Sequence, residues 1–211
     1  MSRIVFFFLL SILPSWGFSQ QVNPYWQYIE VDNTKGMWGD SKEPSWRRYF
    51  GMDMGNINGD DQLDILTGRY VYLNPGGDMT DVWKRLELPI NVDGILVMDV
   101  DGDEYTDLIA QALPELVWLE ATNTEGTKWR SQVIGNIPKT SHTNSQGFER
   151  EQIIAGGKEE FVIAGNGNIY LVESPSTPTK GEWPITLVAE NTSDEGKGIC
   201  DIDGERVMEM A

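Results

Sequence analysis

Cysteine and histidine are each present only once in this sequence, and both scarcities limit its chemistry. Cys200 alone cannot form a disulfide within the chain, so stability has to come from a buried core or from bound ions. His142 alone cannot form a paired-histidine metal site. No nucleophile elbow, phosphate-binding loop or zinc motif occurs in the sequence.

Basic residues are also scarce. The 211 residues contain 16 Lys and Arg against 33 Asp and Glu, which gives a net charge of −17. Nucleic acids are bound through basic surface, so we expect no nucleic-acid partner. A sustained 3.6-residue apolar period is missing as well, whereas short alternating stretches such as "WKRLELPI" and "EFVIAG" are present. These stretches favour strands over helices.

Residues 1–19 have the pattern of a secretory signal peptide. Arg3 precedes an apolar run that Pro14 and Ser15 interrupt, and small residues follow at Gly17 and Ser19. The alternative is a membrane anchor, but the run is short, and no later segment is apolar enough to span a bilayer. We expect a secreted protein, extracellular or periplasmic, without a membrane span.

The stretch "DVDGDEYTD" concentrates four aspartates in nine residues. Numbered from Asp99 as position 1, they occupy positions 1, 3, 5 and 9, and Gly102 at position 4 permits a tight bend. Like charges this close repel one another, and hard cations such as Ca²⁺ are bound by several oxygen ligands at once. The alternative is an acidic, solvated turn before a strand.

The same pattern occurs three times, which favours the metal interpretation. We call residues 56–64, 99–107 and 201–209 the first, second and third acidic loops. Each has Gly at position 4 and a residue at position 7 whose backbone carbonyl could add a ligand. EF-hand loops instead have Gly at position 6 and Glu at position 12. The candidate Ca²⁺ ligands are Asn56, Asn58, Asp60, Gln62 and Asp64; Asp99, Asp101, Asp103, Tyr105 and Asp107; and Asp201, Asp203, Glu205, Val207 and Glu209.

The acidic loops belong to a longer repeat. An aromatic–Leu pair follows at Tyr72–Leu73, Trp118–Leu119 and Tyr170–Leu171, and then a turn-rich stretch leads to Trp83, Trp129 and Trp183. The third copy has a reduced loop at 152–160, which keeps Glu160 at position 9 but has Gln152, Ile154 and Gly156 at positions 1, 3 and 5. We expect no ion there. The Trp and Tyr side chains are expected to fill the space between repeats, with a ligand surface as the alternative.

A period of about 40–50 residues with several short strands is typical of β-propeller blades. The sequence therefore predicts an all-β fold. We expect an N-terminal partial blade or strand at 20–50, in which "WQYIEVD" copies the Trp-led stretch. Blades follow at 51–95, 96–148 and 149–196, with a truncated one at 197–211.

The stretches "GNINGDDQLDIL", "MDVDGDEYTDLIA" and "CDIDGERVMEMA" resemble the FG-GAP/VCBS repeat, the calcium-loop blade of integrin-like propellers. The resemblance covers nearly all of 51–211 and implies Ca²⁺ in the loop between the first and second strands of several blades. The Asn pair of the first acidic loop and the two Glu of the third depart from that pattern. Residues 141–204 also resemble secreted bacterial proteins of this repeat class.

About three complete blades are too few for a ring of the FG-GAP kind. We therefore expect an incomplete ring with missing C-terminal blades, and a small four-bladed closure is the alternative. The expected function is a non-catalytic binding or scaffold module for an extracellular glycan or protein ligand. Adhesion remains a further possibility. The other alternative is a polysaccharide lyase similar to the ulvan lyases, with His142 as base and Tyr105, Tyr170 or Arg69 nearby.

Overall fold

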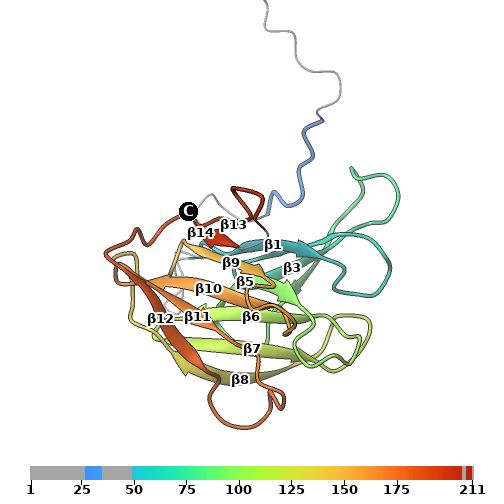
Figure 1. Ribbon diagram of the computed structural model, residues 1–211. Coiled ribbons are helices and arrows are strands. Elements are labelled where there is room, and N and C mark those ends of the chain that lie inside the picture. Colours follow the sequence, from blue (N-terminus) through green and yellow to red (C-terminus); the bar gives the residue numbers. More distant parts are fainter. Residues whose placement is uncertain (1–26, 35–48, 206–207, 211) are drawn as a thin grey trace, which may run out of the picture.

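The structure is a computed structural model that describes residues 27–34, 49–205 and 208–210. It is all-β, with fourteen strands in four antiparallel sheets and no helix in the part of the chain that it describes (Figure 1). The predicted all-β class is thereby confirmed. The expected signal peptide and Trp26 lie outside the described residues.

Three four-stranded sheets follow one another along the chain, and each has its strands in sequence order. The first sheet contains β1 (Met52–Gly55), β2 (Asp64–Thr67), β3 (Tyr70–Leu73) and β4 (Lys84–Glu87). The second contains β5 (Asp93–Met98), β6 (Asp107–Ala112), β7 (Glu115–Ala121) and β8 (Trp129–Asn136). The third contains β9 (Phe148–Glu151), β10 (Glu160–Gly165), β11 (Asn168–Val172) and β12 (Ile185–Glu190). A two-stranded ladder of β13 (Ile199–Cys200) and β14 (Glu209–Met210) ends the described chain.

Local sequence explains the tight connections within these sheets. Asn166 and Gly167 join β10 to β11, and both have positive φ angles, 54° and 75°. Asn-Gly is the preferred pair for a two-residue hairpin turn of this kind. The expected divisions at 95/96 and 148/149 fall inside β5 and at the start of β9, so the second and third sheets begin slightly earlier than the sequence indicated.

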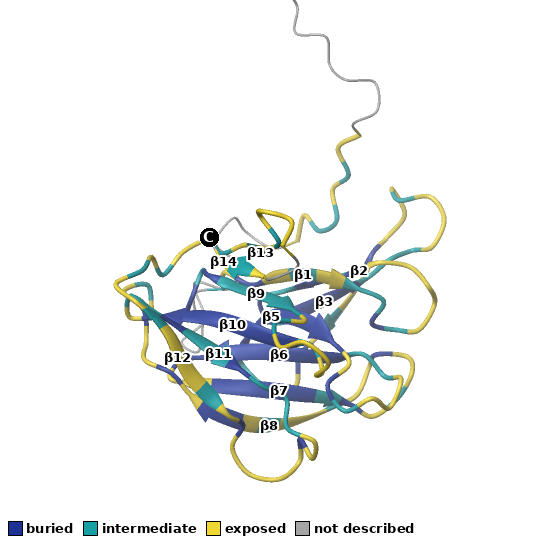
Figure 2. Ribbon diagram, in the orientation of Figure 1, coloured by how far each residue is buried: buried dark blue, intermediate teal, exposed yellow. Residues whose placement is uncertain are grey.

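The sheets pack face to face around two hydrophobic cores. One core joins the first and second sheets, and the other joins the second and third. Strands β5, β6 and β10 are buried along their whole length (Figure 2). Trp118 and Trp183 meet in the second core with ring centroids 5.9 Å apart. These two indoles fill space between sheets, as the sequence led us to expect.

Strand register corrects the alignment of the repeats. The residue two places after the position-9 acid pairs with Val71 in the first sheet, Trp118 in the second and Leu171 in the third. Trp118 is therefore equivalent to Leu171, whereas the aromatic–Leu pairs had aligned it with Tyr170. A shift of one residue moves a side chain to the opposite face of a sheet. Tyr170 accordingly packs against the core between the second and third sheets.

Residues 27–34 run as an irregular segment across the face of the first sheet that is turned away from the second sheet. Val31 packs against a cluster of Tyr70, Tyr72 and Trp83. Asp32 accepts a hydrogen bond from the Tyr72 hydroxyl at 2.9 Å and pairs with Arg85. Burial alone would raise the pKa of Asp32, but the hydrogen bonds hold it well below its usual range.

This contact repeats the packing between the first two sheets. Val31 stands in "WQYIEVD" where Leu88 stands in "WKRLELP". Leu88 packs in one cluster with Val117 and Leu119, and Trp129 lies against it. By register, Val117 and Leu119 are the equivalents of Tyr70 and Tyr72. The segment therefore covers the first sheet much as the end of β4 covers the second.

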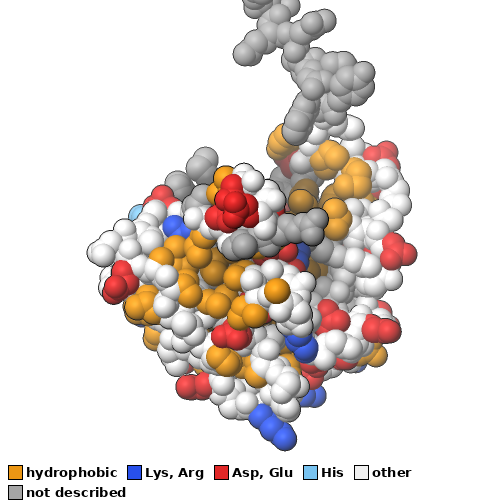
Figure 3. All heavy atoms as spheres, in the orientation of Figure 1, with side chains coloured by type: hydrophobic (Ala, Val, Ile, Leu, Met, Phe, Trp, Pro, Cys, Tyr) orange, Lys and Arg blue, Asp and Glu red, His pale blue; other side chains and the backbone are white. Residues whose placement is uncertain are grey.

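The third sheet keeps part of its apolar surface exposed. Figure 3 shows hydrophobic side chains gathered beside the acidic β13–β14 region. Leu187 and Val188 of β12 are 47% and 44% exposed. Within the described residues, no helix is long and apolar enough to cross a membrane.

Candidate metal loops

The three acidic loops and the reduced loop occupy equivalent places in the fold. Each joins the first strand of a sheet to the second: β1 to β2, β5 to β6, β9 to β10 and β13 to β14. The carboxylates at position 9 begin β2, β6, β10 and β14. The sequence repeat is thus also a structural repeat.

The second acidic loop brings three of its four aspartates together. Carboxylate oxygens of Asp99, Asp101 and Asp107 all lie within 4.8 Å of one another. Asp103 is not part of this group, and its Oδ1 accepts the Tyr105 amide at 2.9 Å. A cation here would meet positions 1, 3 and 9, whereas Asp103 would have to turn toward it.

Hydrogen bonds to backbone amides fix the shape of this loop. Asp99 accepts the amide of Gly102 at 2.8 Å, and Asp101 accepts the amide of Asp103 at 3.2 Å. Gly102 has a φ of +82°, which strains any residue with a side chain, although nothing lies within 4 Å of the place where its Cβ would stand. The glycine at position 4 is therefore required by conformation.

The third acidic loop repeats this arrangement. Asp201 accepts the Gly204 amide at 2.6 Å, and Asp203 accepts the Glu205 amide at 3.0 Å. Asp201, Asp203 and Glu209 form the second group of carboxylates within 4.8 Å. Glu205 lies outside that group, as Asp103 does in the second loop, and Val207 lies outside the described residues.

The first acidic loop differs because amides replace two carboxylates. Asn56 and Asn58 each accept the Asp60 amide through their side-chain oxygens, at 3.0 and 3.2 Å. The Asn58 amide group also donates to the Asp60 carboxylate at 2.9 Å. Gln62 at position 7 is exposed. In this loop a neutral amide group thus donates to the carboxylate at position 5.

The position-9 acid has a structural role in all four loops. In each, it accepts the backbone amide of position 2, from Ile57, Val100, Ile153 and Ile202. Asp64 and Asp107 are fully buried, and Glu160 nearly so. The reduced loop has no acid at positions 1, 3 or 5 and yet keeps this bond. The acid at position 9 therefore closes the loop whether or not positions 1, 3 and 5 are acidic.

Burial and the repulsion between like charges raise the pKa of several acids in the first and second acidic loops. Burial raises the pKa of Asp107 to about 7, against the hydrogen bonds from the Ala121 and Val100 amides. Burial also raises the pKa of Asp101, with the charges of Asp103 and Asp99 adding to the effect. The pKa of Asp64 is raised mainly by burial as well. A bound cation would oppose all of these shifts.

Neighbouring loops are linked across the sheets. The Thr106 hydroxyl, at position 8 of the second loop, donates to the carbonyl of Asn56 at 2.7 Å. The Lys158 ammonium, at position 7 of the reduced loop, donates to the carbonyl of Val100 at 2.7 Å. The reduced loop thus places the positive charge of Lys158 against the backbone of the second acidic loop.

His142 does not meet the residues that a lyase would need. Its ring contacts Phe50, with centroids 6.2 Å apart, and its Nε2 lies 3.4 Å from Glu195. The other three candidates have contacts of their own. Tyr105 belongs to the second acidic loop, Tyr170 packs on the core, and Arg69 pairs with Glu87.

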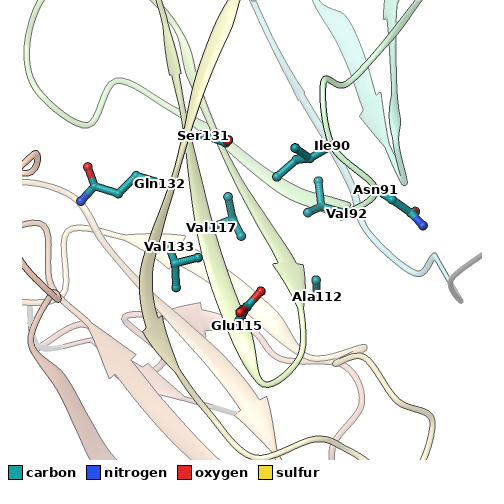
Figure 4. A pocket seen from close by; sticks show the side chains of 9 residues that line it. All are labelled: Ile90, Asn91, Val92, Ala112, Glu115, Val117, Ser131, Gln132 and Val133. Carbon is teal, nitrogen blue, oxygen red and sulfur yellow. The ribbon is translucent and has the colours of Figure 1, made fainter. Parts of the chain in front are cut away.

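A groove of about 340 Å³ lies between residues 90–92 and the second sheet (Figure 4). Three valines give the groove apolar lining: Val92, Val117 and Val133. Its polar groups come from Asn91, Glu115, Ser131 and Gln132. No aromatic or basic side chain is among the residues that line it, and no candidate ligand of the acidic loops reaches it.

Two further carboxylates, outside the acidic loops, connect the sheets. Asp93 is fully buried at the start of β5. Asp53 of β1 accepts the Val97 amide at 2.8 Å and pairs with Arg150 of β9 at 3.3 Å, so it connects three sheets. Asp93 stands in "NVDGILV", where an acid directly before an apolar run is the only indication of a buried role.

No protein-family model matches this chain, and no curated protein matches it.

Proposed function

We propose that this chain is a secreted Ca²⁺-binding repeat protein of the FG-GAP/VCBS type, whose sheets are blades of an incomplete β-propeller. In this proposal it acts as a non-catalytic binding or scaffold module for an extracellular glycan or protein. The observation that carries the proposal is the repeated group of three carboxylates in equivalent loops. Oxygen ligands in that number and density suit Ca²⁺.

The arrangement of the sheets supports the propeller part of the proposal. Strands run in sequence order within each sheet, and consecutive sheets pack face to face through repeated apolar positions. The first strands β1, β5 and β9 adjoin one another, as the inner strands of neighbouring blades would. The packing of Val31 on the first sheet suits a segment that takes the place of an outer strand.

Calcium binding predicts a clear thermal effect. Ca²⁺ that binds only the folded chain stabilises it by mass action, by about 3 kcal/mol at a hundredfold excess over the dissociation constant. We expect the unfolding midpoint of the full chain to rise by several degrees in millimolar CaCl₂ relative to EGTA. The measurement is differential scanning fluorimetry or calorimetry.

The geometry provides a matched pair of variants for this experiment. Asp101→Asn and Asp103→Asn remove the same charge from the same loop, but only Asp101 belongs to the carboxylate group. We expect Asp101→Asn to reduce the Ca²⁺-dependent rise more strongly. An unchanged midpoint in wild type, with a cooperative transition in both buffers, would mean that the loops are charged turns without an ion.

The non-catalytic part needs its own test. The chain would be incubated with anionic polysaccharides, and bond cleavage followed by the absorbance of unsaturated uronic ends. We expect no cleavage, because His142 contacts Phe50 and Glu195 instead of tyrosine and arginine. Cleavage that is lost in His142→Ala would overturn this part and leave the Ca²⁺ proposal intact.

A further inference from the structure

Two asparagines in this chain stand directly before a glycine. One pair, Asn58–Gly59, occupies positions 3 and 4 of the first acidic loop, and the other, Asn166–Gly167, forms the turn between β10 and β11. An asparagine before glycine is prone to deamidation, because glycine has no side chain to keep its backbone nitrogen away from the carbonyl carbon of the asparagine side chain. The surroundings of the two pairs decide which of them can react.

The glycine amides of the two pairs differ in their hydrogen bonds. Gly167 donates its amide to the Asp194 carboxylate at 2.7 Å. The Gly59 amide donates no hydrogen bond to any residue that the structure describes. The nitrogen that would have to attack the asparagine side chain is therefore held in the turn between β10 and β11, and it is free in the first acidic loop.

The equivalent glycines of the other two acidic loops are also held. Gly102 and Gly204 each donate to the carboxylate at position 1 of their own loop, at 2.8 and 2.6 Å. In the first acidic loop, Asn56 at position 1 accepts the amide of Asp60 instead. The free amide of Gly59 is thus a particular feature of this loop among the three.

The Asn58 side chain is folded back along the peptide bond that joins it to Gly59. Its Oδ1 accepts the amide of Asp60, two residues further on, at 3.2 Å, as in an Asx turn. Its Nδ2 donates to the Asp60 carboxylate at 2.9 Å. This turn brings the Asn58 Cγ to the side of the chain on which the Gly59 nitrogen lies. Asn58 is partly exposed and Gly59 is exposed, so water reaches the pair.

We propose that Asn58 is a site of spontaneous deamidation, which replaces the amide at position 3 of the first acidic loop by a carboxylate. The Gly59 nitrogen loses its proton and bonds to the Asn58 Cγ, which closes a five-membered succinimide ring. The bond between Cγ and Nδ2 breaks, and Nδ2 leaves as ammonia with that proton. Water then opens the ring, and it yields aspartate by cleaving the bond to Cγ or isoaspartate by cleaving the bond to the main-chain carbonyl carbon.

The aspartate product changes the ligand set of the first acidic loop. It places at position 3 the acid that the second and third acidic loops already have there. It also removes the amide group that donates to Asp60. This consequence rests on the proposed Ca²⁺ function: a loop with one more carboxylate binds Ca²⁺ more tightly, because the number of charged ligands sets the affinity of such loops.

Peptide mass spectrometry of the full chain, kept at mildly alkaline pH in EGTA, tests the reaction. We expect deamidation at Asn58 to be roughly tenfold faster than at Asn166, because the Gly167 amide must first give up its bond to a charged acceptor. In concentrated urea, which removes the folded structure, the two rates should become similar. Deamidation in the folded chain that is no faster at Asn58 than at Asn166, or a difference that persists in urea, would overturn the proposal.

Two variants separate this proposal from the proposed Ca²⁺ function. Asn58→Gln should slow the reaction strongly, since glutamine would have to close a larger ring, and Asn58→Asp supplies the product directly. We expect Asn58→Asp to increase the Ca²⁺-dependent rise of the unfolding midpoint and Asn58→Gln not to increase it. A rise in wild type that Asn58→Asp leaves unchanged would overturn the consequence for Ca²⁺. The absence of any rise in all three chains would overturn the Ca²⁺ function itself, whereas the deamidation rates are decided by mass spectrometry alone.

Discussion

Position 9 of each loop has a loop-closing role that the sequence did not separate from the proposed ligand role. Oxygen chemistry suggested a cation ligand at Asp64, Asp107 and Glu209. The backbone contacts add a loop-closing bond, which Glu160 retains in the reduced loop. Because the loop-closing bond does not depend on an ion, removing the position-9 acid should lower stability both with and without Ca²⁺.

Glu160→Ala tests this separation. The substitution leaves the amides of Ile153 and Ile154 without their carboxylate acceptor. Because these donors are only part-buried, we expect a cost of about 1 kcal/mol, the low end for a lost acceptor. We expect the unfolding midpoint to fall by the same amount in CaCl₂ and in EGTA. Asp107→Ala is the comparison, and it should also shrink the Ca²⁺-dependent rise. A Ca²⁺ effect that is lost in Glu160→Ala would mean that the reduced loop itself binds the ion.

At the level of the element, loop shape was predictable and strand register was not. Gly at position 4 indicated a tight bend, and Gly59, Gly102 and Gly204 do have positive φ. Composition alone, however, aligned Trp118 with Tyr170. Register is set by hairpin length and by side-chain alternation, and these make Leu171 the equivalent residue.

The contacts between elements were also beyond the sequence. Asp93 and Gln111 lie far from Phe50 and Ser145 along the chain, and no local pattern joins them. The same holds for Lys158 and Val100. A single sequence indicates strands and turn residues through local chemistry, whereas pairing across sheets depends on how the sheets meet. The propeller arrangement and the ions accordingly remain proposals.

Gly102→Ala measures how strongly the bend depends on glycine. We expect a loss of about 1 kcal/mol in the free energy of unfolding, because the +82° φ is unfavourable for alanine even in open space. Gly77→Ala is the matched control. It is equally open but has no positive φ, so its stability should stay the same or rise slightly. Chemical denaturation in EGTA gives both values, and equal losses would contradict the conformational argument.

For the whole molecule, the question is whether the three sheets unfold together. Arg150 of β9 lies between Asp53 of the first sheet and Glu159 of the reduced loop, at 3.3 and 2.9 Å. Its side chain is 31% exposed, so solvent screens the pair only in part. The Arg150–Asp53 ion pair joins the first and third sheets directly. Hydrogen bonds from the Phe50 and Gly51 amides and from the Gln111 side chain to Asp93, and from Gln111 to Ser145, add further links.

Arg150→Met therefore tests whether the three sheets unfold as one cooperative unit. The variant keeps much of the side-chain volume but leaves Asp53 without its guanidinium, and we expect a loss of about 1 kcal/mol. Arg130→Met is the control, because the Arg130–Glu120 pair is exposed and lies within the second sheet. Calorimetry should give equal calorimetric and van't Hoff enthalpies for wild type and a lower ratio for Arg150→Met. If that ratio is unchanged and the midpoints of both variants match, the sheets cohere through their apolar cores alone, and the ion pair has no part in joining them.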